Sequence, residues 1–348
     1  MLVAGIARVR GVAISTSDYE FSCSASTSGI NAIDRKFSGA AAIDGAVVFA
    51  PYHADCVGVY YDAGAAGWEF ECSASTIGLN TSASHSASKF NGAAAIGNTV
   101  VFAPYNANCV GVYADGVFTC DVATTTGLST NNGKFSGAAV LNNKVYFSPW
   151  TANCLGEYAD GEFRCLYSDD SLIGQAAGHE HNGGQDHPYS GIVAFNGKLI
   201  LAPFDFLKIV EIDLESGPTA VDDTSYNSDK FVGAAATTSS VVFAPWLRSC
   251  VGVYVPGSFT CPSPGGPLEE FRSVAAIDDT AVFAPYTNDC VGVYESGAFR
   301  CITAETMPSG IDKFVGAAAI GGKVVFAPHR ADCIGVLTLT PDPTTTTT

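Results

Sequence analysis

The stretch from Lys313 to Val336 reads KFVGAAAIGGKVVFAPHRADCIGV, and variants of it occur seven times along the 348 residues. Most copies continue to a closing Phe-x-Cys motif, but the seventh copy lacks it. The missing piece stands at the other end of the chain, as Phe21-Ser22-Cys23, ahead of the first complete repeat. A repeat completed by the opposite terminus indicates a ring of sheets that is closed by its own N-terminal strand.

Each copy predicts four short antiparallel strands. A Gly-Ala strand, as at Gly92 to Ile96, precedes a two-residue turn of the kind that accepts positive φ and favours a hairpin. The second strand, V-V-F-A, ends on a proline, which cannot donate to a ladder. The third strand is C-V-G-V-Y and the fourth is x-F-x-C. The repeat prolines stand 40 to 54 residues apart, at Pro51, Pro104, Pro149, Pro203, Pro245, Pro285 and Pro328.

Copies of this size cannot bury a core alone and are stabilised by stacking on their neighbours. We therefore predict an all-β fold, a seven-bladed β-propeller of four-stranded antiparallel blades. The expected organisation is an N-terminal extension (1–17), one propeller (18–340) and a Thr-rich linker (341–348). The expected blades are 36–72, 89–120, 134–165, 188–218, 230–261, 270–301, and 313–339 together with 18–23.

Composition narrows the function classes. A net charge of −17 argues against nucleic acid as a partner, because the chain offers no basic patch to neutralise phosphates. The sequence contains no run of 18 apolar residues, so we expect no membrane span. The Thr-rich end resembles the start of a mucin-like or linker segment. We expect the chain to be part of a longer secreted protein.

The twelve cysteines fall into six pairs by repeat position. The expected disulfides are Cys23–Cys333, Cys56–Cys72, Cys109–Cys120, Cys154–Cys165, Cys250–Cys261 and Cys290–Cys301. We expect Cys109 and Cys120 to face each other directly across a hairpin. The fourth copy has Lys208 at the first cysteine position and lacks the second cysteine too, as bonded partners should. The alternatives are reduced buried thiols or a zinc site, although no C-x-x-C occurs. Disulfides place the chain in an oxidising compartment.

The core of the repeat resembles the FG-GAP repeat of integrin-type propellers. The similarity lies in Phe37-Ser38-Gly39-Ala40 and Phe49-Ala50-Pro51-Tyr52, and in their equivalents over most of the chain. The resemblance implies a seven-bladed propeller used for adhesion or recognition. It does not carry over calcium binding, because two-residue turns replace the Asp-rich calcium loops of that family.

One face of the predicted propeller collects the residues that follow each second strand. The expected ligand face consists of Tyr52, His53, Tyr105, Trp150, Phe204, Trp246, Arg248, Tyr286, His329 and Arg330. Lysines that open each first strand gather there as well, at Lys36, Lys89, Lys134, Lys230 and Lys313. Aromatic rings beside polar groups suit sugars or peptides. The alternative interpretation is structural, with each aromatic residue capping its own blade and each lysine extending over it.

An insertion before the fourth blade holds three of the six histidines within nine residues. His179, His181 and His187 stand there beside Asp186 and are a candidate zinc or copper ligand set, or else a solvated polar loop. The chain lacks the common catalytic motifs and carries a glycosylation sequon at Asn80. We expect an extracellular or cell-surface module that binds protein or glycan and needs no cofactor. The alternatives are a metal-dependent hydrolase or lyase using the histidine loop, and a structural matrix protein.

Overall fold

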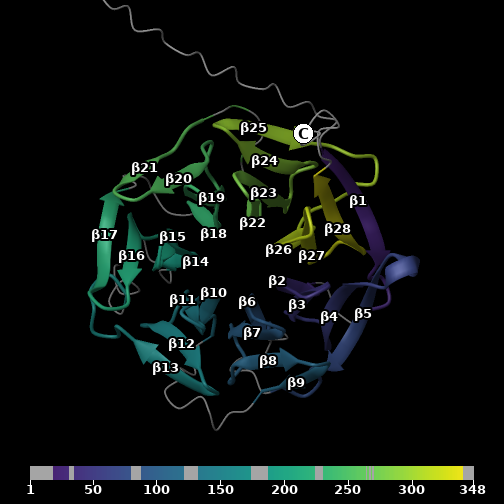
Figure 1. Cartoon of the computed structure of the whole chain (residues 1–348), viewed down its shortest axis with the longest axis horizontal. Helices are drawn as coiled ribbons and strands as arrows, with labels where there is room; N and C mark the ends of the chain where they lie inside the picture. The colour runs from purple at the N-terminus through teal and green to yellow at the C-terminus, as the bar shows by residue number, and fades with distance from the viewer. Residues whose placement is uncertain are drawn as a thin grey trace, which may run out of the picture.

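A computed structural model describes residues 19–30, 35–79, 88–120, 132–173, 187–223, 230–263, 265, 268 and 270–339. Seven sheets, each of four antiparallel strands, stand around a central axis (Figure 1). The structure confirms the predicted all-β, seven-bladed propeller. In the described part of the chain the only helical element is one 3₁₀ turn, Gly64–Ala66. No helix there is long and apolar enough to cross a membrane.

Strand order runs from the axis outward in every blade. The innermost strands are β2 (Phe37–Ile43), β6 (Phe90–Ile96), β10 (Phe135–Leu141), β14 (Tyr189–Phe195), β18 (Phe231–Ala236), β22 (Phe271–Ile277) and β26 (Phe314–Ile320). The second strands are β3 (Ala46–Pro51), β7 (Thr99–Pro104), β11 (Lys144–Pro149), β15 (Lys198–Pro203), β19 (Val241–Pro245), β23 (Thr280–Pro285) and β27 (Lys323–Pro328).

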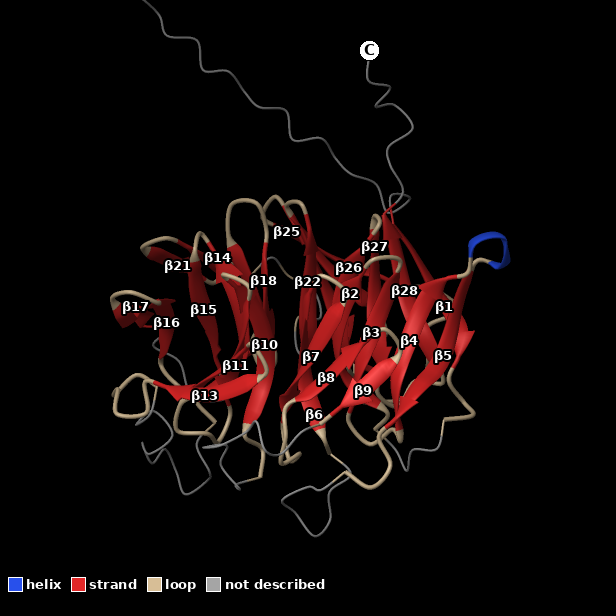
Figure 2. Cartoon of the chain, turned by 60° about the horizontal axis from the view of Figure 1, so that its bottom comes forward, coloured by secondary structure: helices blue, strands red, loops and turns tan. Residues whose placement is uncertain are grey.

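The outer half of each blade follows the same plan. The third strands are β4 (Cys56–Asp62), β8 (Gly111–Ala114), β12 (Leu155–Ala159), β16 (Lys208–Asp213), β20 (Gly252–Val255), β24 (Val291–Glu295) and β28 (Cys333–Leu339). The outermost strands are β5 (Trp68–Ser75), β9 (Val117–Thr119), β13 (Glu162–Leu166), β17 (Gly217–Asp223), β21 (Ser258–Thr260), β25 (Ala298–Ile302) and β1 (Tyr19–Ser26). Figure 2 shows the sheets standing side by side around the ring.

Hairpins between the two inner strands form as the turn signals predict. In the third blade Asn142 and Asn143 have φ of 50° and 59°, and in the fourth Asn196 and Gly197 have 50° and 76°. Two successive positive φ angles define the type I′ turn, whose twist matches that of the flanking strands.

Six of the seven blades have a core built on three phenylalanine rings, whereas the fourth has Tyr189 and Leu201 at the inner two positions. In the second blade Phe90, Phe102 and Phe118 come from the first, second and fourth strands, and their centroids lie 5.7 to 6.2 Å apart. The third strand contributes Gly111 beneath them, where an added Cβ would lie 2.9 to 3.0 Å from all three rings. The repeated glycine therefore makes room for the aromatic cluster.

A second set of glycines brings the blades together around the axis. A Cβ added to Gly39 would lie 2.7 Å from the carbonyl carbon of Gly92, and one added to Gly92 would lie 2.8 Å from that of Gly137. One added to Gly316 would lie 2.8 Å from that of Gly39, so these contacts also join the last blade to the first. At these glycines the innermost strands meet backbone to backbone, at a distance that leaves no room for a Cβ atom.

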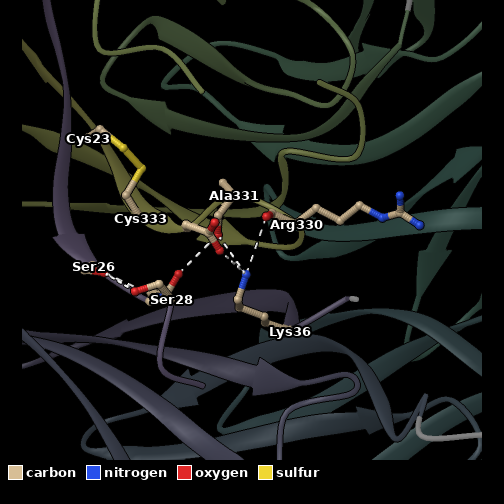
Figure 3. Close-up of polar contacts among 9 residues, drawn as sticks. Cys23, Ser26, Ser28, Lys36, Arg330, Ala331 and Cys333 are labelled. Carbon is tan, nitrogen blue, oxygen red and sulfur yellow. Dashed lines mark hydrogen bonds and ion pairs between the residues drawn. A yellow bond between two sulfur atoms is a disulfide. The ribbon is translucent and has the colours of Figure 1, made fainter. Parts of the chain in front are cut away.

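The ring is closed within its last blade, where β1 pairs with β28 and places Tyr19 opposite Leu339. Cys23 and Cys333 form a disulfide there, with Cα atoms 5.6 Å apart (Figure 3). The Thr27 hydroxyl donates to the carbonyl of Ala331 at 3.1 Å. A covalent bond and hydrogen bonds therefore hold the two ends of the propeller together.

The structure joins the twelve cysteines into the six pairs that the repeat positions predict, and none is free. The expected direct opposition of Cys109 and Cys120 is wrong, because the outer hairpin turns at Asp115-Gly116, where both residues have positive φ. That turn sets Val112 opposite Thr119, and Cys120 therefore comes opposite Gly111. Each such disulfide thus runs diagonally, as in the third blade, where Gly156 is opposite Cys165.

Candidate binding site at the channel mouth

The residue after each second strand is aromatic in all seven blades, and these rings contact one another across blade boundaries. Tyr52 lies 5.9 Å from Tyr105 and 5.5 Å from His329, measured between centroids. Tyr286 lies 6.4 Å from His329 and 5.3 Å from Trp246. The predicted ligand face is therefore a ring of aromatic side chains around the axis.

A cavity of about 560 Å³ runs along the axis inside this ring. Its wall consists of the seven innermost strands, which contribute small residues such as Ala40, Ala93 and Ala138. Each innermost strand is the edge of its sheet, so every second backbone N–H and C=O is directed toward the axis without a ladder partner. One end of the cavity, which we call the channel mouth, is lined by Arg35, Tyr52, Tyr105, Trp150, Arg272, Tyr286 and His329.

Two arginines at the channel mouth, Arg35 and Arg272, were missed by sequence reasoning. The guanidinium of Arg272 lies over two rings, 4.8 Å from the centroid of Trp246 and 5.4 Å from that of Tyr286. Such cation–π contacts fix a guanidinium in place. Arg272 precedes the small residue of its inner strand, a position that holds Ser38, Asn91, Ser136, Ser190, Val232 or Val315 in the other blades. That departure from the repeat was the available signal.

One carboxylate at the mouth pairs with two arginines other than Arg272. Asp312, whose side chain is almost buried, lies 3.6 Å from the guanidinium of Arg35 and 3.4 Å from that of Arg330. Burial, together with a hydrogen bond to Asp312, raises the pKa of Tyr286 to about 12. Burial also raises the pKa of Tyr105 to about 12. Both phenols therefore stay protonated near neutral pH, and the hydroxyl of Tyr286 donates to Asp312.

His329 is held as a neutral ring. Its Nδ1 lies 2.8 Å from the carbonyl oxygen of Phe37, so Nδ1 carries the proton and Nε2 is an acceptor. Burial lowers the pKa of His329 to about 3, and the charges of Arg272 and Arg35 act in the same direction. The imidazole is therefore uncharged over the physiological pH range.

The repeated lysines have a structural role. All five are buried, at Lys36, Lys89, Lys134, Lys230 and Lys313. The ammonium of Lys89 donates to the carbonyl of Ala54 at 3.0 Å, and that of Lys313 to the carbonyl of Thr287 at 2.8 Å. Lys36 makes the corresponding bond to Ala331, across the closure of the ring (Figure 3). Where their bonds are given, as at Lys36, Lys89 and Lys313, these lysines connect their own blade to the loop of the preceding blade, and none of the five lines the cavity.

The ten residues predicted for the ligand face separate into two groups. Five of them line the cavity: Tyr52, Tyr105, Trp150, Tyr286 and His329. The other five do not line the cavity, and most of them contact residues that do. Phe204 packs 5.0 Å from Trp150, Trp246 lies beneath Arg272, and Arg330 pairs with Asp312. His53 stacks on Tyr52 and bonds to Ser88 at 3.0 Å, and Arg248 is half-buried in the loop after Trp246.

Most of the predicted metal loop lies outside the described residues, namely His179, His181 and Asp186, as does the sequon residue Asn80. His187 is described, and its ring stacks on Trp150 with centroids 4.1 Å apart. Among the residues that the structure describes, no group of three His, Cys, Asp or Glu side chains is placed to hold a metal ion. The zinc or copper site stays a prediction.

Comparison with known proteins identifies the fold of this chain but not its function. No protein-family model and no curated protein matches the chain. A virginiamycin B lyase from Staphylococcus aureus is similar in structure, with a TM-score of 0.69 at 16% identity over 92% of this chain and 99% of that one. A catalytically inactive histidine-to-alanine variant of that lyase, with quinupristin, gives a TM-score of 0.69 at 15% identity over 92% and 99% of the two chains.

The WD40 propeller domain of Doa1 gives a TM-score of 0.64 at 10% identity over 92% of this chain and 98% of that one. The extracellular domain assigned to a one component system from B. thetaiotaomicron gives 0.60 at 10% identity, over 93% of this chain and 40% of that one. Identities this low establish a shared propeller fold alone.

Proposed function

We propose that the chain is an extracellular or cell-surface interaction module that binds a protein or a glycan at the channel mouth. The observation that carries the proposal is the cavity on the axis, about 560 Å³ in volume, whose mouth is lined by Tyr52, Tyr105, Trp150 and Tyr286. Ligand sites are typically concave, aromatic and supplied with a few polar groups, and their volumes fall in this range. A purely structural repeat has no need of such a cavity.

The disulfides support an extracellular location. All twelve cysteines are paired, and five of the six bonds reinforce hairpins or their edges within single blades while the sixth joins the chain ends. Bonds of this kind persist in oxidising compartments and are rare in the cytosol. A role in adhesion or carbohydrate binding follows from the same location together with the aromatic mouth.

The test is a binding screen with a matched pair of tryptophan variants. Purified protein is applied to a glycan array and to immobilised extracellular proteins, and each hit is measured with Trp150→Ala and Trp68→Ala. Trp150 lines the cavity, whereas Trp68 lies on an outermost strand, 5.0 Å from Tyr60. We expect Trp150→Ala to weaken binding about tenfold or more, as truncation of an aromatic anchor does, and Trp68→Ala to have no effect. Equal behaviour of the two variants would refute a site at the mouth.

A lyase is the second candidate, because the similar structures include a lyase with an inactive histidine variant and because His329 lines this cavity. The neutral His329, with its pKa near 3, is a weak base at neutral pH. Binding therefore ranks first. Incubation with quinupristin, followed by chromatography, tests the candidate: conversion by the wild-type protein and not by His329→Ala would establish it, and the absence of conversion would dismiss this substrate.

A further inference from the structure

The channel mouth gathers three arginines, and one of them has no acidic partner among the described residues. Arg35 and Arg330 share the carboxylate of Asp312, but Arg272 forms no ion pair with any described residue. The nearby acid Glu270 accepts a hydrogen bond from the hydroxyl of Thr287. Three guanidinium groups therefore meet at this end of the axis beside two carboxylates, Asp312 and Glu270, in a protein whose net charge is −17. A cationic mouth on an acidic protein attracts anions to one place.

The residues around Arg272 hold its side chain in place for binding a ligand. The rings of Trp246 and Tyr286 lie against its guanidinium at 4.8 and 5.4 Å, which restricts the side chain before any ligand arrives. Its N–H groups retain their capacity to donate, because ring faces occupy the plane and not the edge of the guanidinium. A guanidinium edge matches a carboxylate, which can accept two parallel hydrogen bonds.

The opposite wall of the mouth is aromatic. Arg272 belongs to the sixth blade, and in a ring of seven blades the second and third stand across the axis from it (Figure 1). Those blades contribute Tyr105 and Trp150, which line the same cavity. Below them the edges of the inner strands present backbone donors and acceptors to the axis. A ligand held by Arg272 would therefore meet aromatic side chains on the far side and hydrogen-bonding groups beneath.

We propose that the channel mouth binds a carboxylated saccharide, with the carboxylate on Arg272 and the sugar ring against Tyr105 and Trp150. A sugar acid combines the three properties that the site matches: an anionic group, apolar ring faces and several hydroxyls. The volume favours a saccharide over an acidic peptide, because an aspartate or glutamate side chain fills little of a cavity of about 560 Å³. This proposal rests on the binding function proposed above and specifies its ligand.

The experiment is isothermal titration of the full chain with three probes: a glucuronate-terminated disaccharide, the glucose-terminated disaccharide of the same linkage, and a Glu-rich hexapeptide. We expect the acidic disaccharide to bind about tenfold or more tightly than the neutral one, the usual effect of a hydrogen bond to a charged group. Its affinity should fall with added salt. Equal affinity for the two disaccharides would overturn the proposal while leaving a glycan-binding function intact. Tighter binding of the hexapeptide, or no binding of the acidic disaccharide, would also overturn it.

Substitutions of Arg272 test whether this residue contacts the carboxylate of the ligand. Arg272→Gln should lose about tenfold or more in affinity for the acidic disaccharide, and Arg272→Lys, which keeps the charge without the planar fork, should lose less. The matched control is Arg164→Gln, since Arg164 is exposed on β13 and pairs with Glu162. Near-ultraviolet circular dichroism checks that each variant is folded. An unchanged affinity in a folded Arg272→Gln protein would overturn the assignment, and the salt and probe comparisons on the wild-type protein decide the matter if that variant does not fold.

Discussion

At the residue scale, burial decides what the polar groups of the mouth can do. His329 is 5% exposed, and its pKa is about 3 because a charged imidazole would lose its hydration there. The bond from Nδ1 to the carbonyl of Phe37 selects the tautomer. The residue therefore serves the site as a fixed hydrogen-bonding group whose charge does not change near neutral pH.

The same burial predicts how stability depends on pH. The unfolded chain protonates His329 near its ordinary pKa of about 6.5, whereas the folded protein resists protonation down to about 3. Between these values the unfolded state binds more protons, so stability is fully present above about pH 6.5 and falls as the pH decreases. This residue adds at most about 1.4 kcal/mol per pH unit to that slope.

Urea unfolding of the wild-type protein and of His329→Asn at pH 7, 5.5 and 4.5 measures this contribution. Other titrating groups, including Asp312, are common to both proteins, so the difference between the two isolates His329. We expect the stability advantage of the wild type to shrink toward low pH. Parallel pH profiles would show that the histidine is not held neutral.

At the scale of the element, six of the seven blades depend on the glycine of their third strand, and the fourth has Val210 at that position. Gly111 lies under Phe90, Phe102 and Phe118, and equivalent glycines meet the corresponding rings in other blades, as Gly292 does beneath Phe271, Phe283 and Phe299. The aromatic rings therefore come from the first, second and fourth strands, and the third strand has no side chain at that point. This arrangement explains why the repeat keeps glycine within an otherwise apolar strand.

Replacing Gly111 with Ala should destabilise the protein by about 1 to 3 kcal/mol, because the methyl group overpacks a site where the rings stand at 2.9 to 3.0 Å. Gly29 is the matched control, since a Cβ there would meet nothing within 4 Å. The measurement is the free energy of unfolding of the two variants in urea. If Gly29→Ala cost as much as Gly111→Ala, the loss would reflect backbone effects and not packing.

At the scale of the molecule, closure distinguishes one disulfide from the others. Cys23–Cys333 spans 310 residues, whereas Cys109–Cys120 spans 11. In the chain-entropy account a longer loop restricts the unfolded chain more, so the two bonds should contribute more than about 4.7 and about 3 kcal/mol respectively. The bond at the closure is therefore expected to stabilise the whole ring and the hairpin bond mainly its own blade.

Two double variants test this difference. Cys23→Ala with Cys333→Ala should lower the midpoint of urea denaturation more than Cys109→Ala with Cys120→Ala does. Both pairs remove the same atoms, which makes the hairpin pair the control for lost side-chain volume. Equal midpoints would mean that the hydrogen bonds from Thr27 and Lys36 are sufficient to keep the ring closed.

Sequence reasoning reached the architecture because every blade repeats the same local signals. Turn residues, strand-ending prolines and paired cysteines recur seven times or nearly so. Each copy therefore supports the strand assignment made for the others. The diagonal register of the disulfides was missed because a one-residue difference in the turn shifts the pairing, and Asp115-Gly116 decides it. Arg272 was missed because it differs from the residues at the same position in the other blades. The repeat pattern does not indicate which of the residues that differ will line the axis.

The contacts among Gly39, Gly92, Gly137 and Gly316 have one consequence for selectivity. They bring neighbouring innermost strands close together, so the bore of the channel is set by the number of sheets around it and by the small residues that line it. The mouth is built from side chains that can be exchanged without moving that bore. For the binding function proposed above, the spacing of the innermost strands would limit the size of a ligand, and the exchangeable residues at the mouth would determine its chemical class.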